Sequence, residues 1–330
     1  MSNQGSLFQA FLNQADDEAW ARVMTELLPA IHPVDRAATR IWFSFFPLKV
    51  LRALERSPEP ERRAKELLLQ GKYRLAEQID TSAEFLYGHR YWPEVKQAVL
   101  DYAEAAMAPA SLALAEQIQE VARRTAEALR VEPSLLAGIT AVAFMTFQQV
   151  GSEAFHQTAV ASHPRAKRAK SPEQILKDRA RDDSPGWLGF LKTVDKEFTV
   201  TFNERDPSAA FKVVNMQDLT MAAAKDRRDY RSRDPRCIEG PIPVECRTAA
   251  CGTCWVGILS DTSKLSEPGE REVKKMKEFG YSGFTADRDS VVRLACQTKC
   301  YGNVSIVIPP WNGIIGSLNR SEDAKVKSEK

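Results

Sequence analysis

The stretch that decides the fold of the second half of this chain is Cys246-Arg247-Thr248-Ala249-Ala250-Cys251-Gly252-Thr253-Cys254. Three thiols lie in these nine residues, with four and then two residues between them. A fourth thiol, Cys296, follows after 41 intervening residues. This is the spacing C-x4-C-x2-C…C that holds a [2Fe–2S] cluster. The sequence therefore predicts a cluster with the ligands Cys246, Cys251, Cys254 and Cys296.

The residues between these thiols favour the same interpretation. The bridging sulfides of a cluster need hydrogen-bond donors, and backbone N–H groups reach them only where the chain wraps tightly. Small residues allow such wrapping, so we expect a hydrogen-bonding loop made by Arg247, Ala249, Ala250, Gly252 and Thr253. A structural zinc site is the alternative. Zinc sites usually show two short ligand pairs, whereas this chain has a triplet and one distant cysteine, so zinc is less favoured.

Residues from about 198 to 310 resemble the plant-type ferredoxin family. Besides the cluster loop, the resemblance is carried by Leu265-Ser266-Glu267-Pro268 and by Leu294-Ala295-Cys296-Gln297-Thr298. It covers about a third of the chain, and it implies a β-grasp fold and one-electron transfer. Two features depart from the family. The gap between the third and fourth ligands is longer than usual, and a charged insertion from Arg227 to Gly240 precedes the loop.

The composition is typical of a soluble globular protein. The chain has 330 residues, enough for two or three domains, of which 43% are hydrophobic and 27% charged. A net charge of +2 gives no reason to expect nucleic acid as a partner. No signal peptide is expected, and the longest apolar run, 135–147, is too short to span a bilayer. Committing four of six cysteines to a cluster indicates a reducing compartment, so we expect a cytoplasmic protein without a transmembrane segment.

We expect the fold class α + (α+β), with an N-terminal all-α helical bundle and a C-terminal β-grasp domain. Residues 1–158 show helical periodicity, and we assign this helical domain to no family. Within it, 133–156 should be the buried central helix. Residues 159–185 are rich in Lys and Arg and predict a basic linker. Residues 186–318 should form the [2Fe–2S] ferredoxin-like domain, and 319–330 a disordered tail.

Proline, glycine and serine residues predict several element boundaries. Pro47 should interrupt the apolar helical segment 37–54. Gly71 should separate two short helices between residues 62 and 79. Ser266 should cap the helix that follows the cluster loop.

Two further features lie close to the predicted ligands in the sequence. Cys237 and Cys300 are expected to be free thiols on or near the surface; ligand exchange or an oxidative disulfide are the alternatives. Basic residues gather between Lys225 and Arg236, and Arg247 adds another charge. The resulting positive surface would steer acidic partners and tend to raise the reduction potential above the roughly −400 mV of plant-type clusters.

The sequence contains no glycine-rich nucleotide-binding loop, no second cluster motif and no catalytic constellation. Electrons must therefore enter and leave through other redox proteins. We expect a one-electron carrier without catalytic activity of its own, an electron-transfer component of an oxidoreductase system. The helical domain would tether it to a larger redox enzyme or complex, or form a homo-oligomer. Two alternatives stay open: an oxidoreductase subunit whose helical domain holds a second cofactor, and a redox-sensing regulator.

Overall fold

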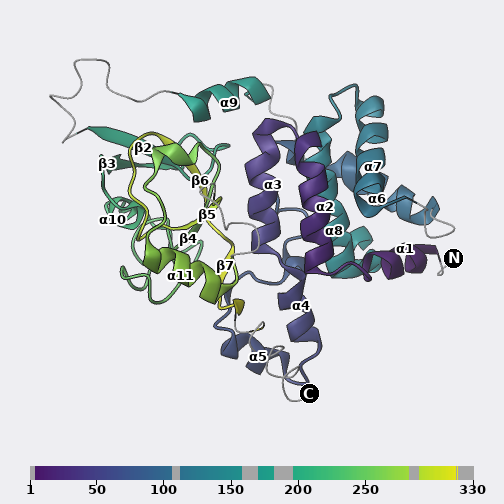
Figure 1. Cartoon of the computed structure of the whole chain (residues 1–330), viewed down its shortest axis with the longest axis horizontal. Coiled ribbons are helices and arrows are strands. Elements are labelled where there is room, and N and C mark those ends of the chain that lie inside the picture. Colours follow the sequence, from purple (N-terminus) through teal and green to yellow (C-terminus); the bar gives the residue numbers. More distant parts are fainter. Residues whose placement is uncertain are drawn as a thin grey trace. The chain divides into compact units, whose positions relative to one another are not determined.

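The computed structural model describes residues 4–105, 112–157, 170–181, 196–281, 290–316 and 318. Close packing divides the chain into two units (Figure 1). The first contains Met1–Leu51 and Arg74–Gln174, and the second contains Arg52–Tyr73 and Ile175–Lys330. The sequence did not indicate that residues 52–73 pack with the C-terminal half.

The first unit is built from helices. They are α1 (Gln4–Leu12), α2 (Asp17–Leu27), α3 (Pro33–Phe45), α6 (Trp92–Ala105), α7 (Leu114–Leu129) and α8 (Ser134–Gln157), with 3-10 turns at Leu28–Ala30, Leu75–Glu77 and Tyr87–Tyr91. Two helices, α4 (Leu48–Glu55) and α9 (Pro172–Ala180), cross the division between the units. The helical class expected for this half of the chain is confirmed.

The long helix α8 forms the core of the first unit. Every residue from Leu136 to Gln148 is buried, and the helix packs against α1, α3, α6 and α7 (Figure 1). The ring of Phe8 lies 5.4 Å from those of Phe144 and Phe147. Among the described helices, α8 is long and apolar enough to cross a membrane, and 72% of its most apolar stretch is buried in the unit. A core helix of a soluble protein meets the same criterion.

Two of the predicted boundaries in this half, at Pro47 and at Gly71, have different outcomes. The break at Pro47 is confirmed, because α3 ends at Phe45 and α4 begins at Leu48. The prediction of two short helices separated at Gly71 is confirmed only in part, since a helix precedes Gly71 and the 3-10 turn Leu75–Glu77 follows it, but Gly71 itself lies in a strand. After α5 (Pro60–Glu66) the chain enters β1 (Gln70–Gly71), where Gly71 has φ of 83° and a Cβ atom would lie 2.5 Å from the Pro310 carbonyl oxygen. A glycine at this position permits close backbone approach and does not simply end a helix.

The second unit contains a five-stranded mixed sheet in the order β3-β2-β6-β4-β5. Its strands are β2 (Glu197–Thr201), β3 (Ala210–Val214), β4 (Trp255–Ile258), β5 (Val292–Leu294) and β6 (Val304–Val307). β2 and β6 are parallel, and the other neighbours are antiparallel. Phe198 and Val200 are buried on one face of β2, as the alternating sequence predicts. Helix α10 (Leu219–Ala223) packs on β3.

Residues from the N-terminal half complete the second unit. β1 pairs antiparallel with β7 (Trp311–Asn312), and Gln70 lies opposite Asn312. The pairing is extended on both sides, since the Lys72 N–H donates to the Pro310 carbonyl at 2.9 Å and the Ile314 N–H donates to the Leu67 carbonyl at 2.8 Å. This part of the N-terminal half is therefore a structural element of the C-terminal unit.

Three other expectations concern the ends and the links of the second unit. Ser266 does not cap α11 (Glu270–Phe279), whose N-cap is Gly269; its hydroxyl accepts from the Lys299 N–H at 3.1 Å instead. In the region expected to be a linker, the described residues form α9, and Arg179 makes a forked ion pair of 2.8 Å with Glu204. The tail expected at 319–330 lies outside the described residues.

Candidate metal centre

Sheet pairing brings the third and fourth predicted ligands together. Cys254 immediately precedes β4, and one residue, Ala295, separates Cys296 from the end of β5. Because Trp255 lies opposite Leu294 in this antiparallel pair, the chain segments beyond them stay adjacent. The Ala295 N–H donates to the Cys254 carbonyl at 2.9 Å. Two cysteines separated by 41 residues in sequence are thus held side by side.

The four predicted ligand thiols lie in two pairs. Cys246 and Cys251 are hydrogen-bonded neighbours, and so are Cys254 and Cys296. Cys254 and Cys296 are buried, whereas Cys246 and Cys251 are half-buried. Within the part of the chain that the structure describes, no three His, Cys, Asp or Glu residues surround a single point as one metal ion would require. Two pairs of thiols are the donor set that a two-iron cluster needs.

Backbone N–H groups of the loop already point at sulfur. Those of Ala250 and Cys251 each donate to the Cys246 sulfur at 3.3 Å. Burial raises the pKa of the Cys246 thiol, but the hydrogen bonds from Cys251 and from the backbone outweigh it and lower the pKa to about 6. The hydrogen bond from Cys254, with further ones from Gln297 and the Ala249 backbone, lowers the pKa of Cys296 to about 7. Cys246 and Cys296 are therefore favoured as thiolates, which are the form that binds iron, whereas the hydrogen bond to Cys296 and burial raise the pKa of Cys254.

Two left-handed residues give the loop its tight curvature. Ala249 has φ of 61° and Gly252 has φ of 68°. A Cβ atom on Gly252 would lie 2.1 Å from Cε1 of Phe279, whose ring is buried. Glycine at 252 is thus required twice, by its dihedral angle and by the ring of α11 packed against it. Ala249 adopts the same dihedral region at a steric cost.

The remaining predicted loop residues have different roles. The Thr253 hydroxyl accepts from the Glu245 N–H at 3.1 Å and lies 3.2 Å from the Cys251 sulfur. The Arg247 guanidinium pairs with Glu239 of the charged insertion. The Arg247 carbonyl accepts from the Gln297 side chain at 3.4 Å.

Gln297 is a site residue to which the sequence analysis assigned no role. Its amide Nε2 donates to the Cys296 sulfur at 3.3 Å and to the Cys296 carbonyl at 2.9 Å. An amide that follows a predicted ligand directly is a sequence signal, but only the three-dimensional structure shows that it folds back onto the sulfur. A side-chain donor to a ligand sulfur is one determinant of a cluster's potential.

The two remaining cysteines are free thiols, as expected, but their expected position on or near the surface is wrong. Cys237 and Cys300 are buried rather than near the surface, with 5% and 0% of their area exposed. The Cys237 thiol donates to the Pro241 carbonyl at 3.3 Å, and the Cys300 thiol donates to the Gly302 carbonyl at 3.0 Å. Burial raises the pKa of Cys237 to about 11. Both act as protonated hydrogen-bond donors, since each has a carbonyl acceptor in a turn that the sequence pattern did not reveal.

A pocket of about 220 Å³ borders Cys251. Ala250, Cys251 and Thr253 form its side toward the loop, and Leu68 and Gln70 contribute from the segment before and within β1. The other lining residues are Glu245, Lys275, Glu278, Phe279, Asn312, Gly313 and Ile314. Solvent thus reaches the loop at Cys251, while Cys254 and Cys296 are enclosed.

Comparisons with known proteins indicate the same cofactor. Residues 235–301 match the family model described as a 2Fe-2S iron-sulfur cluster binding domain. The chain is similar to a ferredoxin from Bacillus thermotolerans, with 37% identity over 59 residues. The match covers 18% of this chain and 42% of that ferredoxin, so the chain spans less than half of its length. No solved structure matches the chain. The C-terminal half therefore contains a ferredoxin-type domain with a [2Fe–2S] cluster as its cofactor.

Proposed function

We propose that this protein carries single electrons between redox proteins, and that its four loop and strand cysteines hold the cluster. Cys246 and Cys251 would ligate one iron, and Cys254 and Cys296 the other. The observation that carries this proposal is the arrangement of the thiols in two pairs. When bound, the cluster accepts and releases one electron.

The surrounding residues support this role without taking part in bond making or breaking. The Ala250 and Cys251 N–H groups and the Gln297 amide offset negative charge on sulfur. The rings of Phe279 and Trp255 are buried, with centroids 5.8 Å apart, and the Phe279 ring packs against Gly252 of the loop. Cys246 and Cys251, which are half-buried, would give electrons a short path to a docked protein.

We also infer that the second unit has the β-grasp topology. Its sheet order β3-β2-β6-β4-β5 supports this assignment, because the first and last strands of the described sheet are parallel neighbours at its centre. An antiparallel strand flanks each of them, and a helix follows the first hairpin.

The helical unit would tether the carrier to a larger redox enzyme or complex. A tether raises the local concentration of a carrier at its partner to about the millimolar range. Localisation in the cytoplasm belongs to the same proposal, and it is supported by six cysteines that are all free thiols.

Purification of the full chain from its natural source tests the tether. We expect a redox enzyme to co-purify with the tagged protein, and also with a Cys254→Ser/Cys296→Ser variant that cannot hold the cluster. Retention by this variant would assign the attachment to surfaces other than the cluster site. Loss of the enzyme from both proteins would contradict the tether, and a second chromophore in the purified chain would favour an oxidoreductase subunit instead.

A further inference from the structure

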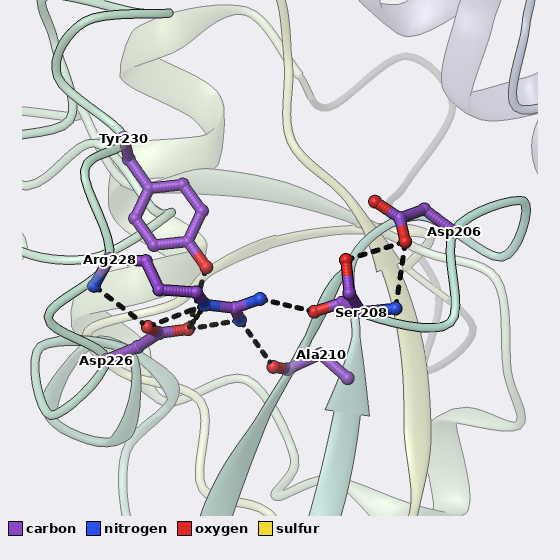
Figure 2. A network of polar contacts seen from close by, with 6 residues as sticks. All are labelled: Asp206, Ser208, Ala210, Asp226, Arg228 and Tyr230. Atoms are coloured by element: carbon purple, nitrogen blue, oxygen red, sulfur yellow. Dashed lines mark hydrogen bonds and ion pairs between the residues drawn. The ribbon is translucent and has the colours of Figure 1, made fainter.

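The charged insertion before the cluster loop is held by two Asp-x-Arg clasps, Asp226 with Arg228 and Asp234 with Arg236. In the first copy, the Asp226 carboxylate accepts from the Arg228 backbone N–H at 3.2 Å and from its guanidinium Nε at 2.9 Å. The other side of the guanidinium donates to the Ala210 carbonyl at 2.8 Å and also to that of Ser208 (Figure 2). The Tyr230 hydroxyl donates to the same carboxylate at 2.7 Å. This clasp fixes the start of the insertion to the β2–β3 hairpin.

The second copy fixes the middle of the insertion to another part of the unit. The Asp234 carboxylate accepts from the Arg236 backbone N–H at 3.1 Å and from its Nε at 3.0 Å. The guanidinium then donates to the Pro309 carbonyl at 2.8 Å and to the Asn312 side chain at 3.2 Å. The Arg236 side chain is 8% exposed. In both clasps one arginine joins a local carboxylate to the backbone of a distant segment.

A third contact joins the insertion to the cluster loop itself. Glu239 pairs with Arg247, which directly follows the first predicted ligand. The segment from residue 226 to 239 is therefore attached at its start, middle and end, to the hairpin, to the 309–312 segment and to the cluster loop. Three such attachments leave little conformational freedom between them.

Some of the insertion's charged residues form ion pairs, and others are exposed to solvent. Arg228, Arg236 and Arg247 are each paired with a carboxylate. Four exposed cations have no ion-pair partner in the described part of the chain: Lys225, Arg227, Arg231 and Arg233. The carboxylates of Asp206 and Asp229 lie near Arg233. Ile238, 58% exposed, follows the second clasp and adds apolar surface.

We infer that this surface, the arginine platform formed by Arg227, Arg231 and Arg233, docks the acidic face of a redox partner protein. The inference rests on the proposed carrier function and deepens it by naming the partner's chemistry. Guanidinium groups form forked hydrogen bonds with carboxylates, and arginines held on a clasped frame lose little freedom when a partner binds. Arginine is also enriched at protein interfaces.

A gold electrode coated with a carboxylate-terminated monolayer can stand in for the acidic partner. The full-length holoprotein is compared with an Arg227→Gln/Arg231→Gln/Arg233→Gln variant. The matched control, Arg271→Gln/Lys274→Gln/Lys277→Gln, removes the same charge from exposed positions of α11. We expect the platform variant to exchange electrons about tenfold more slowly than wild type at low salt, and the control less than twofold more slowly.

Equal slowing of the two variants, or an unchanged rate in the platform variant, would overturn the docking surface. Reduction of all three proteins by methyl viologen in solution separates this outcome from failure of the carrier function. If wild type accepts no electron from methyl viologen, the carrier function itself is contradicted.

An Asp226→Asn variant tests whether the frame matters beyond its charge. This change makes the surface more positive but removes the carboxylate that the first clasp requires. We expect slower exchange with the carboxylate monolayer despite the added positive charge, and an unchanged rate with methyl viologen. A faster exchange than wild type would show that net charge alone controls docking, and would overturn the role of the clasp.

Discussion

Glu272 and Arg293 form a buried ion pair that connects α11 to β5. The guanidinium Nε lies 2.8 Å from the Glu272 carboxylate, and the two side chains are 3% and 0% exposed for Arg293 and Glu272. The same carboxylate accepts from the Leu294 N–H at 2.8 Å. Arg293 also donates to the Ser266 carbonyl at 2.8 Å. The pair therefore holds the end of the strand from which Cys296 follows.

Breaking this pair should destabilise the C-terminal unit. A Glu272→Gln variant leaves the Arg293 charge buried without its partner, which costs roughly 3–5 kcal/mol of unfolding free energy. Urea denaturation followed by the cluster absorbance measures the loss. Glu270→Gln, at an exposed position of the same helix, should change stability by less than about 0.5 kcal/mol. A Glu272→Met/Arg293→Met variant should be more stable than the single variant; the reverse order would contradict the explanation.

The two left-handed residues of the cluster loop should respond in opposite ways to exchange of glycine and alanine. Gly252→Ala places a methyl group against Phe279 and should destabilise the loop by at least about 2 kcal/mol. Ala249→Gly relieves a strained dihedral angle but adds freedom to the unfolded chain, so its net effect should stay within about 1 kcal/mol. The measurement is cluster retention during a urea titration of each variant. Equal loss in both variants would argue against the backbone explanation.

Gln297 should tune the reduction potential. A Gln297→Leu variant removes the donor that lies 3.3 Å from the Cys296 sulfur. Fewer donors to sulfur favour the oxidised cluster, so the potential should fall on the order of tens of millivolts. Protein-film voltammetry gives the value. Thr298→Ser is a control, because the Thr298 hydroxyl donates to the Leu294 carbonyl instead. A higher potential in Gln297→Leu would refute this role.

The Asp226 clasp should make stability depend on pH in acid. The hydrogen bond from Arg228, with those of Tyr230 and the backbone, lowers the pKa of Asp226 from 3.8 to about 2, against the effect of burial. A folded-state pKa below the unfolded one stabilises the protein above about pH 4, and this stabilisation is lost as the pH falls toward 2. The difference in urea midpoint between wild type and Asp226→Asn should therefore shrink between pH 5 and pH 2. A difference that is independent of pH would exclude this linkage.

Local patterns predicted those features that depend on neighbouring residues. The cysteine spacing indicated the cofactor, Pro47 marked a helix break, and the apolar run before Gln148 indicated the core helix. The signals for the helix break and the core helix are confined to a short window. The cysteine spacing extends to the distant Cys296, but it can be read from the sequence without knowing how the strands pair.

Features that depend on distant partners were not predictable in this way. Gly71 looked like a helix break, because nothing near it shows that β1 pairs with residues 311 and 312. Ser266 looked like a helix cap, although its hydroxyl accepts a hydrogen bond from the Lys299 N–H. Burial of Cys237 and Cys300 likewise depends on turns formed by the folded chain.

Iron and acid-labile sulfide analysis of the anaerobically purified full chain tests the central claim most directly. We expect about two irons and two sulfides per chain and a one-electron reduced state visible by electron paramagnetic resonance. Serine substitution of Cys246, Cys251, Cys254 or Cys296 should abolish or shift this signal, whereas Cys237→Ser and Cys300→Ser should leave it unchanged. One zinc per chain without labile sulfide, or a signal that survives all four ligand substitutions, would contradict the account.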